Sequence, residues 1–162
     1  MDIRNATEDD LPHILKLNEA FEHFLSPLSW DRLVDLHQQA DYHRVAWDEQ
    51  MLVGFLIAFR EGRSYDSINY RWFNDRFPSF LYIDRVVAKN ARRGIGTALY
   101  QDVISYAATT SVPNVVCEFD TDPPNEPSSQ FHRRFGFQQV GTQPVQGGKK
   151  QVSMQRLELN MR

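Results

Sequence analysis

The residues between positions 90 and 97 combine the side chains and glycines that a phosphate site requires. They are Asn90, Ala91, Arg92, Arg93, Gly94, Ile95, Gly96 and Thr97. Glycine lets the main chain turn tightly and approach a ligand without a clash at Cβ. A helix that begins near Gly96 would add the partial positive charge of its N-terminus, and the two arginines would add full charges. The sequence therefore predicts a cradle for a diphosphate, with main-chain amides as donors.

Other glycine-rich phosphate motifs fit the same segment poorly. A dinucleotide-binding fold would need a third glycine at the position of Leu99, and a P-loop NTPase would need Gly-Lys-Ser/Thr. The plainer alternative is that Gly94 and Gly96 only shape a turn between a strand and a helix, with the arginines in solvent. The glycine pattern alone leaves both the cradle and the plain turn open.

The segments on either side of the cradle have the patterns of a strand and a helix. The run from Phe80 to Val87 is apolar on both faces at its ends, which is typical of a central strand. From Thr97 to Ala107, apolar residues recur at helical spacing. A second buried strand is expected from Val115 to Phe119. The cradle is therefore expected in the loop of a strand–helix–strand crossover.

The rest of the chain completes a mixed α/β pattern in the order β α α β β β α β α β β. The other expected strands are 3–6, 43–47, 52–60 with a bulge at Gly54, 137–141, and 151–159 with a bulge between Met154 and Leu157. The other expected helices are 9–24, one that Ser29 caps, and one that Asn125 caps and Gly136 ends. No repeat or linker divides the sequence, so residues 1–162 are expected to form a single domain.

Composition and charge exclude several classes of protein. The 162 residues are 41% hydrophobic and 24% charged, within the ordinary range for a folded globular domain. The net charge of -3 argues against coating nucleic acid or an anionic membrane, because both need a basic excess. A single cysteine, Cys117, favours a reducing compartment. With no apolar run of signal-peptide or membrane-span length, we expect a cytoplasmic protein that binds no nucleic acid, no membrane and no metal.

Two motifs resemble those of the GNAT (GCN5-related N-acetyltransferase) superfamily. The strand–loop–helix motif of that family, Gln/Arg-x-x-Gly-x-Gly/Ala, is similar to residues 91–96, with Ala91 where Gln or Arg is usual. A downstream family pattern, Asn-x-x-Ala-x-x-Leu-Tyr-x-Lys-x-Gly-Phe, is matched in order by Asn125, Ser128, Phe131, His132, Arg134, Gly136 and Phe137. The resemblance covers essentially the whole chain. It implies an α/β fold of the α+β type, with a mostly antiparallel sheet of about seven strands and about four helices.

The resemblance also implies an acetyl-CoA-dependent N-acetyltransferase in which an amine attacks the thioester directly. In this family the diphosphate binds at the cradle and the pantetheine arm pairs with the main chain of the fourth strand. The implied cofactor-binding residues are Val86, Val87, Arg92, Arg93, Gly94, Ile95, Gly96, Thr97, Asn125, Ser128, Phe131 and Arg134. A tyrosine usually protonates the departing thiolate. Its position holds His132 here, and histidine can donate a proton near neutral pH.

The attacking amine has to be neutral, so a carboxylate close to it would assist the reaction. Glu118, Asp84 and Asp120 are the candidates for this base. Glu118 lies on a strand that is otherwise buried, where a charged group needs either a partner or a function. The alternative for Glu118 is a structural salt bridge to an arginine such as Arg85.

The long segment from Glu61 to Ser79 is expected to be a loop that lines the acceptor pocket. Its aromatic rings and carboxylates could bind a cationic amine, and the expected substrate residues are Tyr65, Tyr70, Trp72 and Phe73. A homodimer contact or a cover over a sheet edge are the alternatives. The acceptor could be a small molecule, an amino acid or a peptide. Because His132 replaces the usual tyrosine, a non-catalytic acyl-CoA-binding or regulatory domain stays open.

Overall fold

The structure is a computed structural model that describes residues 1–21, 26–89 and 93–160. Its seven strands form a mixed, mostly antiparallel sheet in the order β1-β2-β3-β4-β5-β7-β6. The strands are β1 (Asp2–Asn5), β2 (Tyr42–Asp48), β3 (Met51–Arg60), β4 (Leu81–Ala88), β5 (Asn114–Asp122), β6 (Gln138–Val145) and β7 (Lys150–Glu158). The α-helices within the described ranges are α1 (Leu11–Glu19), α2 (Trp30–Gln39), α3 (Ile68–Asn74), α4 (Ile95–Thr109) and α5 (Glu126–Phe135). The expected fold class is confirmed, with one more helix than expected.

Two compact units make up the chain, the first from residues 1–59 and 83–106 and the second from residues 60–82 and 107–162. The boundary falls inside β4, directly after Tyr82. The parallel pairs of β4 with β5, Leu81 with Val115 and Tyr82 with Val116, belong to the second unit. The expectation of a single domain stays a prediction.

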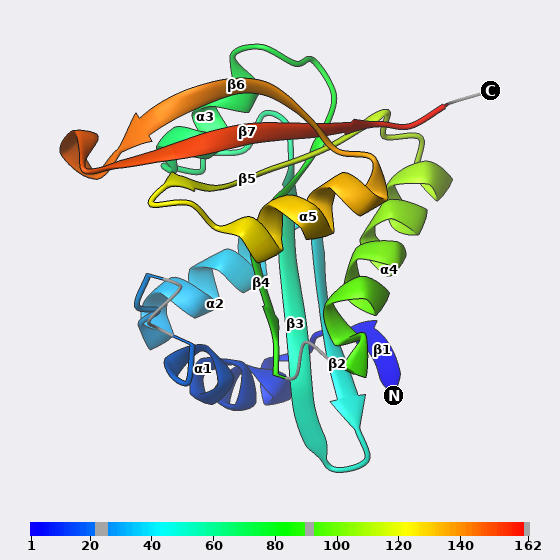
Figure 1. The fold of residues 1–162 in the computed structure, drawn as a ribbon. Coiled ribbons are helices and arrows are strands. Elements are labelled where there is room, and N and C mark those ends of the chain that lie inside the picture. Colours follow the sequence, from blue (N-terminus) through cyan, green and yellow to red (C-terminus); the bar gives the residue numbers. More distant parts are fainter. Residues whose placement is uncertain (22–25, 90–92, 161–162) are drawn as a thin grey trace. The chain divides into compact units, whose positions relative to one another are not determined.

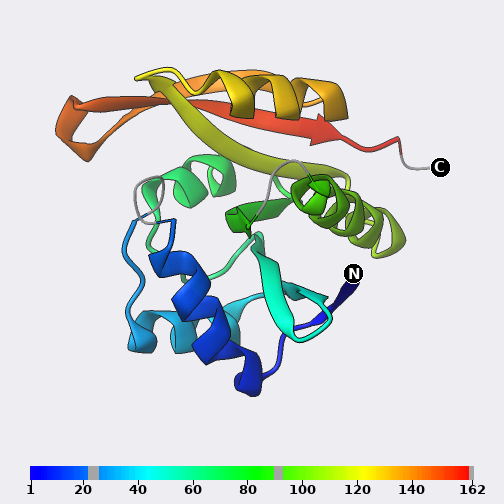
Figure 2. The same ribbon diagram turned by 60° about the horizontal axis from the view of Figure 1, so that its bottom comes forward.

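In the first unit, helices cover both faces of the antiparallel strands β1, β2 and β3 (Figures 1 and 2). On one face, the hydroxyl of Tyr42 in β2 donates to Asp102 of α4 at 2.5 Å. On the other face, the ring of His43, the next residue of β2, lies 5.0 Å from that of His37 in α2. Neighbouring side chains of a strand point to opposite faces, so α4 covers one face and α2 the other.

In the second unit, α3 and α5 cover opposite faces of the strands β5, β7 and β6 (Figure 1). Asn69 of α3 donates to Glu118 of β5 at 3.0 Å. The ring of Phe119, the following residue of β5, lies 5.3 Å from that of His132 in α5. Asn125 caps α5 by accepting from the Ser128 amide, as the sequence predicts.

Helix α3 corrects the expectation of a long loop over residues 61–79. Its N-cap is Ser67, whose hydroxyl accepts from the amide of Tyr70 at 3.3 Å. The seven residues of α3 include an isoleucine and three aromatic residues, all of them weak helix formers. Packing of Tyr70 and Phe73, which are 1% and 0% exposed, therefore holds the helix rather than local propensity.

The position of the bulge in the closing strands also differs from expectation. The register of β6 against β7 shifts between Gln139 and Gly141, so the extra residue is Val140 of β6 rather than a residue of β7. The bulge expected between Met154 and Leu157 is therefore wrong. Residues 152–155 are all buried because both faces of β7 are covered. In such a strand the apolar residues do not alternate, so their spacing could not predict where a bulge lies.

The first helical segment is shorter than expected. A 3-10 turn spans Glu8–Asp10 and α1 ends at Glu19, whereas the expected end at Phe24 lies outside the described residues. A bulge was expected at Gly54. The structure has it one residue earlier, between Leu52 and Gly54, since Ala46 pairs with Gly54 and Trp47 with Leu52. Within residues 1–21, 26–89 and 93–160, no helix has both the length and the apolar character that a membrane crossing requires.

Candidate functional site

The predicted cradle lies at the start of α4, which begins at Ile95. Gly94 has a φ of +72°, and a Cβ added there would meet nothing within 4 Å. Its carbonyl accepts from the amide of Ala98 at 3.0 Å, which makes Gly94 the entry to the helix. The first amides of an α-helix have no acceptor within the helix, so this turn suits an anion. Three residues predicted for the same loop, Asn90, Ala91 and Arg92, lie outside the described residues.

Basic side chains flank this turn. Arg93 forms an ion pair with Asp48 at 3.0 Å while its side chain stays 61% exposed, and the Lys89 amine contacts the Met51 sulfur at 2.9 Å. A hollow of about 660 Å³ adjoins them, and its lining is Asp48, Glu49, Gln50, Met51, Val53, Lys89, Arg93 and Ile95. Sequence reasoning did not predict that residues 48–51 line this hollow, because only the register of the β2–β3 hairpin brings its turn close to the cradle.

Gly54 of β3 fixes how closely α4 approaches the sheet. A Cβ at this position would lie 2.9 Å from Ile95 Cγ2, 2.9 Å from the Val87 carbonyl oxygen and 3.1 Å from Leu99 Cδ1. Real Cβ atoms do not come this close to other atoms, so only glycine fits between β3 and the first turns of α4. The position of the cradle on the first unit therefore depends on a glycine that the sequence marked only as a bulge.

The candidate residues of β4 differ in burial. Val87 is 3% exposed, whereas Asp84 and Val86 are half-buried. Directly after the strand, the amide of Lys89 donates to the carbonyl of Val53 at 2.8 Å, which joins this end of β4 to β3. In the first unit, the structure thus gathers Asp84, Val86, Val87 and the described part of the cradle.

The candidate residues of α5 lie in the second unit. Asn125 and Arg134 are exposed, and Ser128 and Phe131 are half-buried. The side-chain oxygen of Asn125 is used as the helix cap, at 3.2 Å from the Ser128 amide. The ring of Phe131 lies 5.2 Å from that of Phe135 on the same helix.

His132, the predicted acid, is a buried residue of α5 and is 5% exposed. Its ring lies 5.3 Å from the rings of both Phe119 and Phe137. Burial lowers the pKa of His132, although a hydrogen bond between Nδ1 and the Ser128 carbonyl oxygen, at 2.7 Å, acts in the opposite direction. Because Nδ1 donates to that carbonyl, Nε2 of the neutral ring is an acceptor. The ring has to gain a proton at Nε2 before it can act as an acid there.

Glu118, the first candidate base, lies on the face of β5 that α3 covers. Its Oε1 atom accepts from the hydroxyl of Tyr82 at 2.8 Å and from the amide of Asn69 at 3.0 Å. The arginine considered as its partner, Arg85, donates instead to Asn18 and to Ser26. His132 packs on the opposite face of β5, so within the second unit the candidate base and the candidate acid are on different faces of the sheet.

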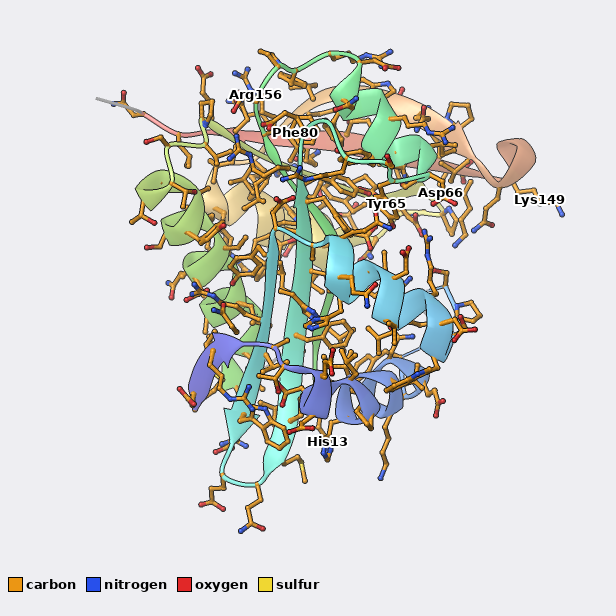
Figure 3. All side chains as sticks on the ribbon, turned by 180° about the vertical axis from the view of Figure 1, so that it is seen from behind. His13, Tyr65, Asp66, Phe80, Lys149 and Arg156 are labelled. Carbon is orange, nitrogen blue, oxygen red and sulfur yellow. The ribbon has the colours of Figure 1, made fainter. Side chains whose placement is uncertain are left out.

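The four aromatic residues expected in an acceptor pocket pack on the second unit. Tyr65, Tyr70 and Phe73 are buried, and the hydroxyl of Tyr70 donates to the Arg60 carbonyl at 2.6 Å. Trp72 covers β6 at Gly141, where a Cβ would overlap its ring. Figure 3 shows Tyr65 beside Asp66 ahead of α3, and Lys149 at the tip of the β6–β7 turn. Trp72 thus packs on a face of the edge strand β6, and the acceptor role of these four residues stays a prediction.

Metal ligands and other charged groups give no second centre in the described part of the chain. There, no three His, Cys, Asp or Glu side chains are grouped closely enough to hold a metal ion. Asp120, the third candidate base, is ion-paired with Lys150 at 3.4 Å. The chemistry that the described residues could support is therefore anion binding at α4 and proton transfer at Glu118, Asp84 or His132.

Solved structures with the same fold identify the class of protein. A ribosomal-protein-alanine N-acetyltransferase from Brucella melitensis is 25% identical, with a TM-score of 0.74 over 98% of this chain and 100% of that chain. The ribosomal-protein-S18-alanine N-acetyltransferase of Escherichia coli is 14% identical, with a TM-score of 0.75 over 99% and 95% of the two chains. An N-acetyltransferase from Staphylococcus aureus Mu50 is 12% identical, with a TM-score of 0.78 over 97% and 96%. The fold is that of N-acetyltransferases.

The family follows from the sequence match. Residues 3–137 match the model of the acetyltransferase (GNAT) family, and these residues make up most of the chain. The protein therefore belongs to the GNAT acetyltransferases and is an acyltransferase by family, as its two motifs predict. No curated protein is similar enough to count as a match.

Proposed function

We propose that this protein transfers the acetyl group of acetyl-CoA to a primary amine, by direct attack of the amine on the thioester. One observation supports the proposal most strongly. In a chain of the GNAT family, a left-handed glycine, Gly94, directly precedes α4, beside the basic side chains of Arg93 and Lys89 and a hollow of about 660 Å³. A diphosphate matches both the charge and the donors of this turn.

The cofactor contacts follow from this assignment and from the family. The diphosphate would be held by residues 92–97, and the main chain of Val86 and Val87 would bind the pantetheine arm. From α5, Asn125, Ser128, Phe131 and Arg134 would contact the cofactor. These roles rest on the family motifs.

The reaction has three requirements that side chains can meet. The amine must lose a proton, a carbon–nitrogen bond must form as the carbon–sulfur bond breaks, and the departing thiolate must gain a proton. We assign the first step to Glu118, with Asp84 as the alternative base. The motif assigns the last step to His132, which would have to be protonated at Nε2 despite its lowered pKa.

A peptide N-terminus is the first acceptor to test, with amino acids and small amines as the other classes. The Brucella relative is named as an enzyme that acts on ribosomal-protein alanine, and a free α-amino group has a pKa near 8, which makes it easier to deprotonate than an alkyl amine. The cytoplasmic location and a homodimer stay predictions.

A thiol-release assay with acetyl-CoA tests this function directly. Alanine-initiated peptides, free amino acids and small diamines are offered in turn, and CoA binding is followed by the rise in melting temperature that a ligand of the native state causes. We expect both CoA binding and amine-dependent thiol release. CoA binding without thiol release for any amine would leave only the non-catalytic acyl-CoA-binding domain.

The chain offers a matched pair of variants for the cradle. Gly94 and Gly62 both have a positive φ, +72° and +77°, and neither has an atom within 4 Å of an added Cβ. Alanine costs about 1 kcal/mol of backbone strain at either position. We expect Gly94→Ala to weaken CoA binding roughly tenfold, as the loss of one or two hydrogen bonds to a charged group would. Gly62→Ala should lower the melting temperature similarly and leave CoA binding intact; equal CoA affinity in the two variants would contradict a cradle at Gly94.

A further inference from the structure

Three elements of the second unit meet at the carboxylate of Glu118, and a fourth, β6, is linked to it through Asn69. Tyr82 from β4 and Asn69 from α3 both donate to Oε1, at 2.8 Å and 3.0 Å. Asn69 in turn accepts through Oδ1 from Nε2 of Gln143 in β6, at 2.8 Å. A chain of hydrogen bonds therefore runs from the edge strand β6, through α3, to the carboxylate on β5.

The direction of the Asn69 amide follows from Gln143. An asparagine amide has one accepting end and one donating end. Because Gln143 donates to the oxygen of Asn69, the NH2 group of Asn69 faces Glu118. Gln143 is itself joined to α3 a second time, since Nε2 also lies 3.4 Å from the Ile68 carbonyl oxygen.

The two donors to Oε1 are uncharged, whereas the donor to Asp120, on the same face of β5, is a lysine ammonium. Asp120 faces Lys150 at 3.4 Å, so a neighbouring ammonium already offsets its charge. A tyrosine hydroxyl and a carboxamide orient Oε1 of Glu118 through these two hydrogen bonds. A carboxylate has about four acceptor sites, so the bonds with Tyr82 and Asn69 do not exhaust its capacity to accept a proton.

The two donors also differ in how firmly they are held. Tyr82 is 1% exposed, and its ring packs 5.6 Å from Tyr70 and 5.8 Å from Phe73. Asn69 is half-buried on a helix of seven residues, so its amide depends on Gln143 for its orientation. The buried tyrosine and the Gln143–Asn69 pair thus both hold Oε1 of the carboxylate.

From this arrangement we infer that Tyr82 and Asn69 are positioning residues that hold Glu118 as the general base, and that Gln143 positions Asn69. The inference rests on the proposed acetyl transfer, in which Glu118 takes the proton of the attacking amine. A base that is held in place removes this proton faster than one that must first be ordered.

The test measures kcat and the KM of acetyl-CoA for Tyr82→Phe, Asn69→Ala and Glu118→Gln. The acceptor is an alanine-initiated peptide, or whichever amine gives the fastest thiol release in the screen described above. We expect kcat to fall about 100-fold in Glu118→Gln, the lower end of general-base effects, and roughly tenfold in each of the other two. The KM of acetyl-CoA should stay within about twofold, because the cradle is untouched.

Two controls separate positioning from a loss of stability. Tyr42→Phe removes another buried tyrosine hydroxyl that donates to a carboxylate, that of Asp102 in the first unit. Asn74→Ala removes another asparagine of α3, whose oxygen accepts from the Gly62 amide at 2.8 Å. Both controls should lower the melting temperature as much as their partners Tyr82→Phe and Asn69→Ala, with wild-type kcat.

The pH dependence of kcat/KM separates a positioning role from a purely structural role, because a structural defect would lower kcat/KM equally at every pH. Above about pH 9 a peptide α-amine is already neutral in water, so the base is no longer needed. The kcat/KM deficits of Tyr82→Phe and Asn69→Ala should therefore shrink as the pH rises from 7 to 9.5. Deficits that stay constant over this range would overturn the positioning role.

The outcomes distinguish this inference from the function on which it rests. If the wild-type protein is active and both Tyr82→Phe and Asn69→Ala keep kcat within about twofold, the positioning role is overturned and acetyl transfer stands. Wild-type turnover in Glu118→Gln would show that another residue is the base, and would overturn the inference as well. A wild-type protein that releases no thiol with any amine would remove the proposed function and the inference together.

Discussion

Gly54 lies where β3 passes beneath the first turn of α4, and replacing it with alanine tests how the fold positions the cradle. The added Cβ would lie 2.9 Å from Ile95 Cγ2, 2.9 Å from the Val87 carbonyl oxygen and 3.1 Å from Leu99 Cδ1. The two side chains could rotate away. The Val87 carbonyl is main chain and cannot, so the start of α4, the end of β4 or both have to move.

The expected cost follows from this overlap. An extra methyl in a well-packed core costs about 1–3 kcal/mol, and for a domain of this size that lowers the melting temperature by roughly 2 to 12 °C. A second effect follows from the position of Ile95 at the first residue of α4. If the turn shifts, its amides lose alignment with the diphosphate, and we expect CoA to bind about tenfold more weakly.

Thermal unfolding with and without CoA, together with calorimetric titration of CoA, measures both effects. The matched control is Val45→Ala on β2. Val45 is 0% exposed and lies on the face of the sheet away from α4, so this variant should lose stability and keep its CoA affinity. A wild-type melting temperature in Gly54→Ala would refute the packing argument. Equal loss of CoA affinity in both variants would show that stability, and not the placement of α4, controls binding.

Two further predictions concern buried histidines. If His132 protonates the thiolate, His132→Phe lowers kcat at an unchanged KM for acetyl-CoA, because the new ring keeps the packing near Phe119 but has no proton to give; wild-type kcat would remove the assignment. Burial, and then the neighbouring His37, lower the pKa of His43 to about 4, below its unfolded value near 6.5. Its contribution to stability is therefore complete above pH 6.5 and declines as the pH falls toward 4, by up to about 3 kcal/mol. Urea unfolding at pH 7 and pH 4.5 should show a smaller difference for His43→Leu than for the wild type, and equal differences would contradict this account.

Local signals in the sequence predicted most of the elements. The Ser29 hydroxyl caps α2 by accepting from the Arg32 amide, and Asn125 and Gly136 bound α5 as their residue types suggest. These predictions succeeded because a cap depends on residues only two or three positions away. Helix α3 was missed for the converse reason. Its stability comes from burial of Tyr70 and Phe73 against residues outside the helix, Phe80 and Tyr82.

The candidate site also has features that depend on local sequence and features that depend on tertiary structure. The sequence by itself predicted an anion site, since the spacing of Gly94 and Gly96 before a helical pattern is a local property, and its two motifs predicted the family, which the family match over residues 3–137 confirmed. Only the tertiary structure decided which residues surround each group. It placed the β2–β3 turn beside Arg93, buried His132 among aromatic rings, and gave Glu118 its partners Tyr82 and Asn69. Such neighbours depend on strand register and helix packing, which join residues that are 36 and 49 positions apart.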